Sequence, residues 1–174
     1  MRIVANKNKN SKKKFPWRII LDNEKCVPVP SQHNFKSVFI QKHGCSLVAF
    51  YMALRFRGVK KNMQQVLQYA RKKLKCGAKY PLTEVCRGIN MICQGKPAVY
   101  HKSMTDKQLK AHLQKGRMVL FEENNPIHTV VLLRDSKTGK LYRFSDGKKN
   151  VTTIAKENVR RCMNEKYKGI IVVK

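Results

Sequence analysis

The apolar positions in the first half of the chain recur at helical spacing. The segment from Cys45 to Arg57 is apolar on most of its faces, which predicts a buried central helix, and Gly58 stands where such a helix ends. Apolar residues three and four positions apart predict further, amphipathic helices. These are expected at Met63–Leu74, at Leu82–Met91 and at Thr105–Leu113, the last with Ser103 as its cap.

After residue 116 the pattern changes to short β-rich runs separated by turn signals. Strands are predicted at Met118–Phe121, Thr129–Leu133, Leu141–Phe144 and Gly169–Val173. Before the first helix, extended segments are expected at Trp17–Leu21, Val27–Val29 and Val38–Gln41. Helices followed by strands imply an α+β domain in two layers, with an antiparallel sheet in its C-terminal half and a cleft where the layers meet.

The length of 174 residues fits one domain. The segment Asn6–Lys14 is rich in Lys and Asn and has almost no apolar side chains, so it cannot bury enough surface to fold. We therefore expect a flexible basic arm over residues 1–14 and one folded domain over residues 15–174.

The chain is strongly basic, because 38 Lys and Arg residues against 10 Asp and Glu residues give a formal net charge of +28. Such a charge attracts polyanions and anionic surfaces without specifying which. The basic N-terminus is not followed by an apolar stretch, and no apolar run reaches the roughly 18 residues of a membrane span. The sequence thus predicts a cytoplasmic protein with no signal peptide and no transmembrane segment.

The six cysteines form no CxxC pair, and their intervals match no zinc ribbon or zinc finger. We therefore expect no structural metal and no other cofactor. In the absence of a signal peptide, reduced thiols are expected rather than disulfides. The cysteines are Cys26, Cys45, Cys76, Cys86, Cys93 and Cys162.

Cys45 has the setting of a catalytic nucleophile. It stands on the first turn of the predicted central helix, and Gly44 before it lets another backbone segment approach closely. The positive end of the helix macrodipole stabilises a thiolate over a thiol, so a cysteine at this place is nucleophilic near neutral pH. The alternative is a small core residue at a helix start, which is the usual role of a lone cysteine.

His128 and Asp146 favour the catalytic interpretation. His128 opens the apolar run His128–Leu133, and Asp146 stands in an Asp-Gly turn at the end of the next predicted strand. A hairpin would bring the carboxylate beside the imidazole, where it orients the ring and stabilises its cation. Either residue alone is more typical of a surface or a turn. Together with Cys45 they predict a Cys-His-Asp triad.

The ordered set of motifs resembles the bacteriocin-processing peptidases of the papain-like family, which cleave after double-glycine leaders. The resemblance covers about residues 35–173. It rests on Gln41 and Gly44-Cys45-Ser46 at the head of an apolar helix, on residues 128–133 and on residues 140–147, which read Lys-Leu-Tyr-Arg-Phe-Ser-Asp-Gly.

This resemblance implies a papain-like fold in which Cys45, His128 and Asp146 form the triad. It also implies that a glutamine upstream of the cysteine holds the oxyanion through its side-chain amide. Gln41 is the candidate for this role, and Gln32 is a more remote alternative.

These residues predict a thiol-dependent hydrolase that cleaves a peptide or protein substrate. Two alternatives stay open. The chain departs from the family where no proline follows Gly-Cys-Ser and where Gly147, not proline, follows Asp146, so a catalytically diverged module that binds nucleic acid or another polyanion is the second interpretation. Acyl transfer to an amine is the third, because the same residues would serve it.

Overall fold

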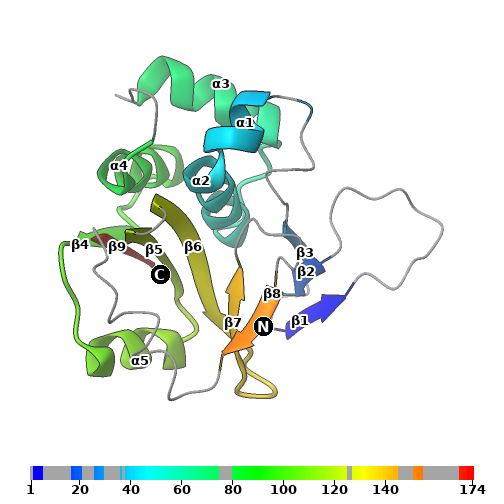
Figure 1. Cartoon of the computed structure of the whole chain (residues 1–174), viewed down its shortest axis with the longest axis vertical. Helices are drawn as coiled ribbons and strands as arrows, with labels where there is room; N and C mark the ends of the chain where they lie inside the picture. Colours follow the sequence, from blue (N-terminus) through cyan, green and yellow to red (C-terminus); the bar gives the residue numbers. More distant parts are fainter. Residues whose placement is uncertain are drawn as a thin grey trace.

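Two antiparallel sheets and a set of helices make up the structure, which is a computed structural model (Figure 1). It describes residues 2–5, 17–20, 26–29, 36, 38–74, 80–124, 127–144, 151–154 and 169–174. In these residues the larger sheet has the strand order β4-β9-β5-β6-β7-β8, and the smaller sheet has the order β1-β2-β3. Every strand pair is antiparallel. The predicted α+β class and the C-terminal antiparallel sheet are therefore confirmed.

The elements have the following bounds within the described residues. The helices are α1 (Val38–His43), α2 (Cys45–Phe56), α3 (Met63–Lys73), α4 (Leu82–Cys93) and α5 (Asp106–Gln114). The smaller sheet consists of β1 (Arg2–Ala5), β2 (Trp17–Ile20) and β3 (Cys26–Val29). The larger sheet consists of β4 (Ala98–His101), β5 (Met118–Asn124), β6 (Ile127–Arg134), β7 (Leu141–Phe144), β8 (Val151–Ile154) and β9 (Gly169–Val173).

Most helices and strands lie where the apolar pattern predicted them, but two local predictions were wrong. Val38–Gln41 is not extended and belongs to helix α1, which leads through Gly44 into α2 because the Gly44 N–H donates to the Ile40 carbonyl (2.8 Å). The cap of α5 is Thr105 and not Ser103. Thr105 and Gln108 form a capping box, in which each side chain accepts a hydrogen bond from the other residue's backbone N–H.

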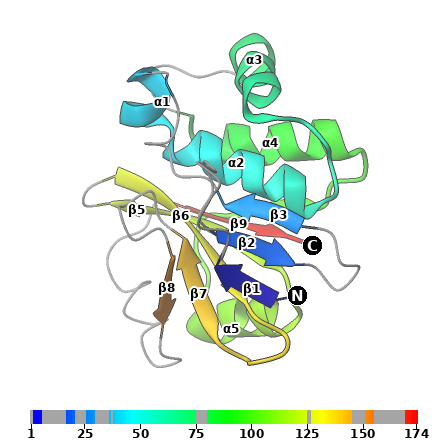
Figure 2. The ribbon, with the colours of Figure 1, turned by 90° about the vertical axis from the view of Figure 1, so that its right-hand side faces the viewer.

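Helices cover both faces of the larger sheet, which makes three layers where the sequence predicted two (Figures 1 and 2). Helices α2 and α4 pack on one face, with α1 and α3 against α2, and α5 packs on β5 and β6 from the other face. The reason is that β5 and β6 are apolar on both sides. Leu120 and Val131 belong to the core under α2, whereas Phe121 and Val130 belong to a second core under α5.

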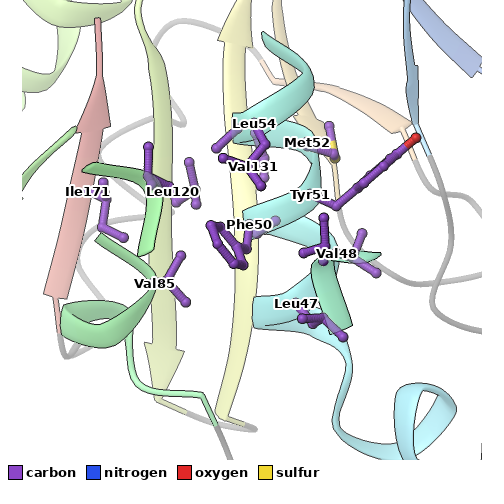
Figure 3. Close-up of a cluster of buried hydrophobic side chains, with 14 of the residues drawn as sticks. Leu47, Val48, Phe50, Tyr51, Met52, Leu54, Val85, Leu120, Val131 and Ile171 are labelled. Carbon is purple, nitrogen blue, oxygen red and sulfur yellow. The ribbon is translucent and has the colours of Figure 1, made fainter. Parts of the chain in front are cut away.

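The larger core is built around Phe50 of α2, which lies between Val85 of α4 and the sheet residues Leu120 and Val131 (Figure 3). Phe50 is fully buried, and burying a side chain of this size contributes about 1.5–3 kcal/mol. The close approach of α4 depends on Gly88, because a Cβ at this position would lie 2.9 Å from the Phe50 ring. The packing therefore fixes the position of α2 on the sheet.

The N-terminal strands differ in part from the prediction. β2 and β3 lie at the expected extended segments, and β1, inside the expected arm, pairs with β2 through Arg2–Ala5. The rest of the arm, residues 6–14, lies outside the described residues, so the division into an arm and one domain stays a prediction. None of the helices described here is both long enough and apolar enough to cross a membrane.

Candidate active site

Gly44 sets the start of the central helix. Its φ of −85° is open to any residue, so the need for glycine is steric. A Cβ at this position would collide with the carbonyl oxygen and the side chain of Ile40. The Gly44 N–H donates to this carbonyl, and the Gly44 carbonyl accepts from Val48 N–H, both at 2.8 Å. The expectation that Gly44 permits a close backbone approach is confirmed, and the neighbour is the last turn of α1.

Cys45 is the first residue of α2 and is half-buried. No side chain caps this helix end, and no acidic residue lies in its first turn. A thiolate at Cys45 therefore meets the positive end of the helix macrodipole without competition from a neighbouring carboxylate of the same helix.

His128 of β6 lies beside the Cys45 thiol and interacts with it by a hydrogen bond and by its charge. Burial alone raises the pKa of the Cys45 thiol. The hydrogen bond from the His128 side chain, the backbone hydrogen bond of Thr129 and the charge of His128 lower it, and the result is a pKa below the usual value of a cysteine. The two residues that the sequence predicted as nucleophile and base are thus brought together.

The other described thiols have the opposite tendency. Burial raises the pKa of Cys86, and a backbone hydrogen bond from Tyr100 offsets only part of this increase. Burial also raises the pKa of Cys93, with a smaller lowering by the charge of Arg57. All three described thiols are free. Among them, Cys45 alone has a pKa below the usual value of a cysteine.

A second contact lies directly behind the Cys45–His128 pair. The hydroxyl groups of Ser46 and Thr129 are 2.9 Å apart, and the two residues are only 5% and 4% exposed. Ser46 also lies 3.9 Å from the Cys45 sulfur, measured to its Oγ. The hydrogen bond joins the first turn of α2 to β6 next to Cys45 and His128. It therefore fixes the relative position of the two elements that carry Cys45 and His128.

Of the remaining predicted site residues, only Gln41 lies among the described residues. Gln41 lies on α1, one helical turn before Cys45, and is half-buried. Asp146 lies outside the described residues, as does the alternative Gln32. The last described residue of β7 is Phe144, which pairs with Val131 of β6. The assignments of Asp146 and of the oxyanion glutamine therefore stay predictions.

Glu123 is a carboxylate near His128 that the sequence did not single out. It stands on β5 directly opposite His128 in the β5–β6 register, so their side chains project from the same side of the sheet. Its carboxylate accepts a hydrogen bond from Arg143 of β7 at 2.6 Å, and this ion pair is about one quarter exposed. Glu123 is therefore already neutralised by a cation that reaches across β6.

Ser46, Thr129 and Glu123 are the residues near the site that sequence reasoning missed. A signal for the first two was present, because each follows one member of the predicted pair Cys45 and His128. The position of Glu123 opposite His128 depends on the register of the β5–β6 hairpin, and the apolar pattern of the sequence does not determine this register. Among the described residues, no group of His, Cys, Asp and Glu side chains is arranged to hold a metal ion.

The sequence matches no protein-family model, and no curated protein is significantly similar to it.

Proposed function

We propose that the protein is a thiol peptidase of papain-like type in which Cys45 is the nucleophile and His128 the acid and base. The observation that carries the proposal is the contact of Cys45 with His128 at the start of α2, together with a pKa that is lowered for this thiol and raised for the other two described thiols. A helix N-terminus and a neighbouring imidazolium each activate a cysteine as a nucleophile.

The reaction begins with a thiolate–imidazolium pair. The Cys45 thiolate attacks the carbonyl carbon of a peptide bond, and the resulting oxyanion is stabilised by backbone N–H groups at the start of α2 and by the amide of Gln41. His128 then donates its proton to the leaving amine, and the carbon–nitrogen bond breaks. A thioester between the substrate acyl group and Cys45 remains.

Water completes the cycle. His128, now neutral, removes a proton from a water molecule that attacks the thioester carbonyl. The carbon–sulfur bond breaks, the carboxylic acid product leaves, and the thiolate–imidazolium pair is restored. Asp146 orients His128 through this exchange. An amine that replaces water as the acceptor would give a transferase, so products are best analysed with and without an added amine.

Digestion of a peptide library tests the proposal. The library is incubated with the wild-type protein, with Cys45→Ala and with Cys86→Ala, and new peptide termini are identified by mass spectrometry. We expect the same new termini from wild type and Cys86→Ala and none from Cys45→Ala. Termini that persist with Cys45→Ala would contradict a role for Cys45, and a library left intact by wild type would contradict the peptidase.

The second candidate function is polyanion binding by a diverged module. It is favoured by the positive surroundings of His112, whose pKa is lowered by burial and then by the charges of Arg117, His101, Lys115 and Lys174. Arg117 also bonds to the His112 ring at 2.8 Å. This function requires that Cys45→Ala binds single-stranded nucleic acid as the wild type does, with an affinity that falls steeply between about 50 mM and about 200 mM salt.

A further inference from the structure

A pocket opens between α5 and the end of the β6–β7 hairpin, far from Cys45. It has a volume of about 180 Å³. Arg134, which lines it, is six residues further along β6 than His128, and at about 3.3 Å per residue the two are roughly 20 Å apart. β6 runs from the side of α2 toward this end of the sheet (Figure 1). The lining residues of this α5–hairpin pocket are Lys110, Leu113, Gln114, Arg134, Gly139 and Leu141.

The hairpin wall of the pocket is held together by hydrogen bonds within its turn. Asp135 is buried, and its carboxylate accepts hydrogen bonds from the backbone N–H groups of Lys137 and Thr138 at 2.9 and 2.8 Å. The Gly139 N–H donates to the Asp135 carbonyl at 2.9 Å. Gly139 has a φ of +69°, and the Arg134 guanidinium lies 3.1 Å from where its Cβ would stand. Glycine at this position therefore leaves room for the guanidinium beside the turn.

The pocket carries two positive charges and no negative one. None of its six lining residues is acidic. The side chains of Arg134 and Lys110 form no hydrogen bond or ion pair with any residue that the structure describes, including Asp106 one turn before Lys110 on α5. A planar guanidinium and an ammonium group that line one pocket without a counter-charge favour a carboxylate or a phosphate.

The floor of the pocket is apolar. Leu113 and Leu141 are 1% and 8% exposed and belong to the core beneath α5. A cavity of about 180 Å³ is smaller than the usual 300–1,000 Å³ of sites for drug-sized ligands. The fitting ligand is therefore small and has an anionic group for the two cations and a short apolar part for the two leucines.

We propose that the α5–hairpin pocket binds a carboxylate that carries a short aliphatic chain. Arg134 and Lys110 hold the carboxylate, Gln114 donates a further hydrogen bond at the rim, and Leu113 and Leu141 receive the chain. A free aliphatic acid and the C-terminal residue of a peptide share this chemistry. The site is independent of the peptidase proposal, because its residues lie at the other end of β6.

NMR titration of the full-length ¹⁵N-labelled protein tests the site. The probes are 4-methylpentanoate, its neutral amide, inorganic phosphate, and a tetrapeptide that ends in leucine with a free or an amidated C-terminus. We expect 4-methylpentanoate to shift the amide signals of Leu113, Gln114 and Gly139. The neutral amide and phosphate are expected to bind at least about tenfold more weakly, since each lacks one of the two interactions.

Two variants complete the test. Arg134→Gln is expected to weaken binding about tenfold, whereas Lys115→Gln, an exposed lysine of the same helical region outside the pocket, is expected to leave it unchanged. Unaltered signals elsewhere show that Arg134→Gln is folded. Equal binding of the amide or of phosphate, equal loss in both variants, or no shift at Gly139 would overturn the proposal. Tighter binding of the free-ended peptide than of the acid identifies a peptide C-terminus as the ligand, and the reverse identifies a small acid.

Discussion

The hydroxyl groups of Ser46 and Thr129 form a buried hydrogen bond of 2.9 Å that lies one residue behind the Cys45–His128 pair on both elements. The bond joins α2 to β6 where Cys45 and His128 meet. Because both residues are buried, loss of either hydroxyl leaves the other without this partner. The pair therefore links the stability of the junction to the reactivity of Cys45.

The first prediction separates these two effects. Ser46→Ala and Thr129→Val are each expected to lower the free energy of unfolding by about 1–3 kcal/mol, and to slow alkylation of Cys45 by iodoacetamide near neutral pH. The double variant removes both polar groups, so its stability should recover in part. Its alkylation should stay slow, because the Ser46 hydroxyl, one of the groups that lower the pKa of Cys45, is gone.

Urea unfolding and peptide mapping after alkylation check this prediction. Thr129→Ser keeps a hydroxyl and serves as the matched control, with near-wild-type reactivity. A double variant that regains both stability and reactivity would show that the hydrogen bond only supports the fold.

The second prediction concerns pH. The pKa of Cys45 is lowered because interactions with His128 and Thr129 outweigh burial, which acts in the opposite direction. In His128→Gln the positive charge is removed and burial remains, so the pKa of Cys45 should rise toward or above the usual cysteine value of about 8.5. The midpoint of the pH dependence of alkylation should move to higher pH.

Mass spectrometry of the individual alkylated peptides measures this midpoint. Cys86 provides an internal control, because burial already raises its pKa and His128 is not among the causes. An unchanged midpoint for Cys45 in His128→Gln, or an equal shift for Cys86, would show that His128 is not the partner of the thiol.

The sequence was sufficient to predict the central helix, and it singled out Cys45 and His128, which the structure brings into contact. Both depend on local signals: an apolar helix that starts at a cysteine after glycine, and a histidine at the mouth of an apolar strand. The first core follows from the same pattern, because Phe50 and Leu47 are apolar residues of that helix and are fully buried.

The features that the sequence did not predict depend on long-range packing. β4 and β8 are four-residue strands, too short to give a clear local pattern, and β4 also pairs with the distant strand β9. The helix α1 is formed by residues with strand preference, Val38 among them, and is positioned by its junction with α2. The α5–hairpin pocket requires α5 to cover the second sheet face, which the expectation of two layers did not include.

The third prediction addresses Gly44. A methyl group here would collide with the Ile40 carbonyl, which is backbone and cannot rotate away. Gly44→Ala should therefore cost about 1–3 kcal/mol of stability and move the start of α2, with a loss of Cys45 reactivity. Gly58→Ala, at the other end of α2, is the control. Its φ of 81° makes alanine unfavourable by about 1–2 kcal/mol, but Cys45 should react as in the wild type.

Chemical unfolding and the alkylation rate of Cys45 distinguish the two glycines. If Gly44→Ala loses only stability and keeps its reactivity, the glycine serves the fold and does not position the nucleophile.

The fourth prediction concerns the carboxylate that orients His128. Asp146 is the proposed residue, because Glu123, which faces His128 across the β5–β6 register, already forms an ion pair with Arg143. The rate of peptide hydrolysis should have a bell-shaped dependence on pH. The acid limb reports the formation of the thiolate–imidazolium pair, and the alkaline limb reports its loss. Asp146→Asn removes a charge that favours the protonated ring. The alkaline limb should therefore move to lower pH, and the maximal rate should fall.

Glu123→Gln is the matched control, since it also replaces one carboxylate by an amide of the same size. We expect both limbs of its profile to coincide with those of the wild type. The measurement is kcat/KM against pH on a peptide from the library digestion, because this quantity reports the ionisation of the free enzyme. If Glu123→Gln moves the alkaline limb and Asp146→Asn does not, Glu123 is the carboxylate that orients His128. Its ion pair with Arg143 would then not prevent it from acting on the ring.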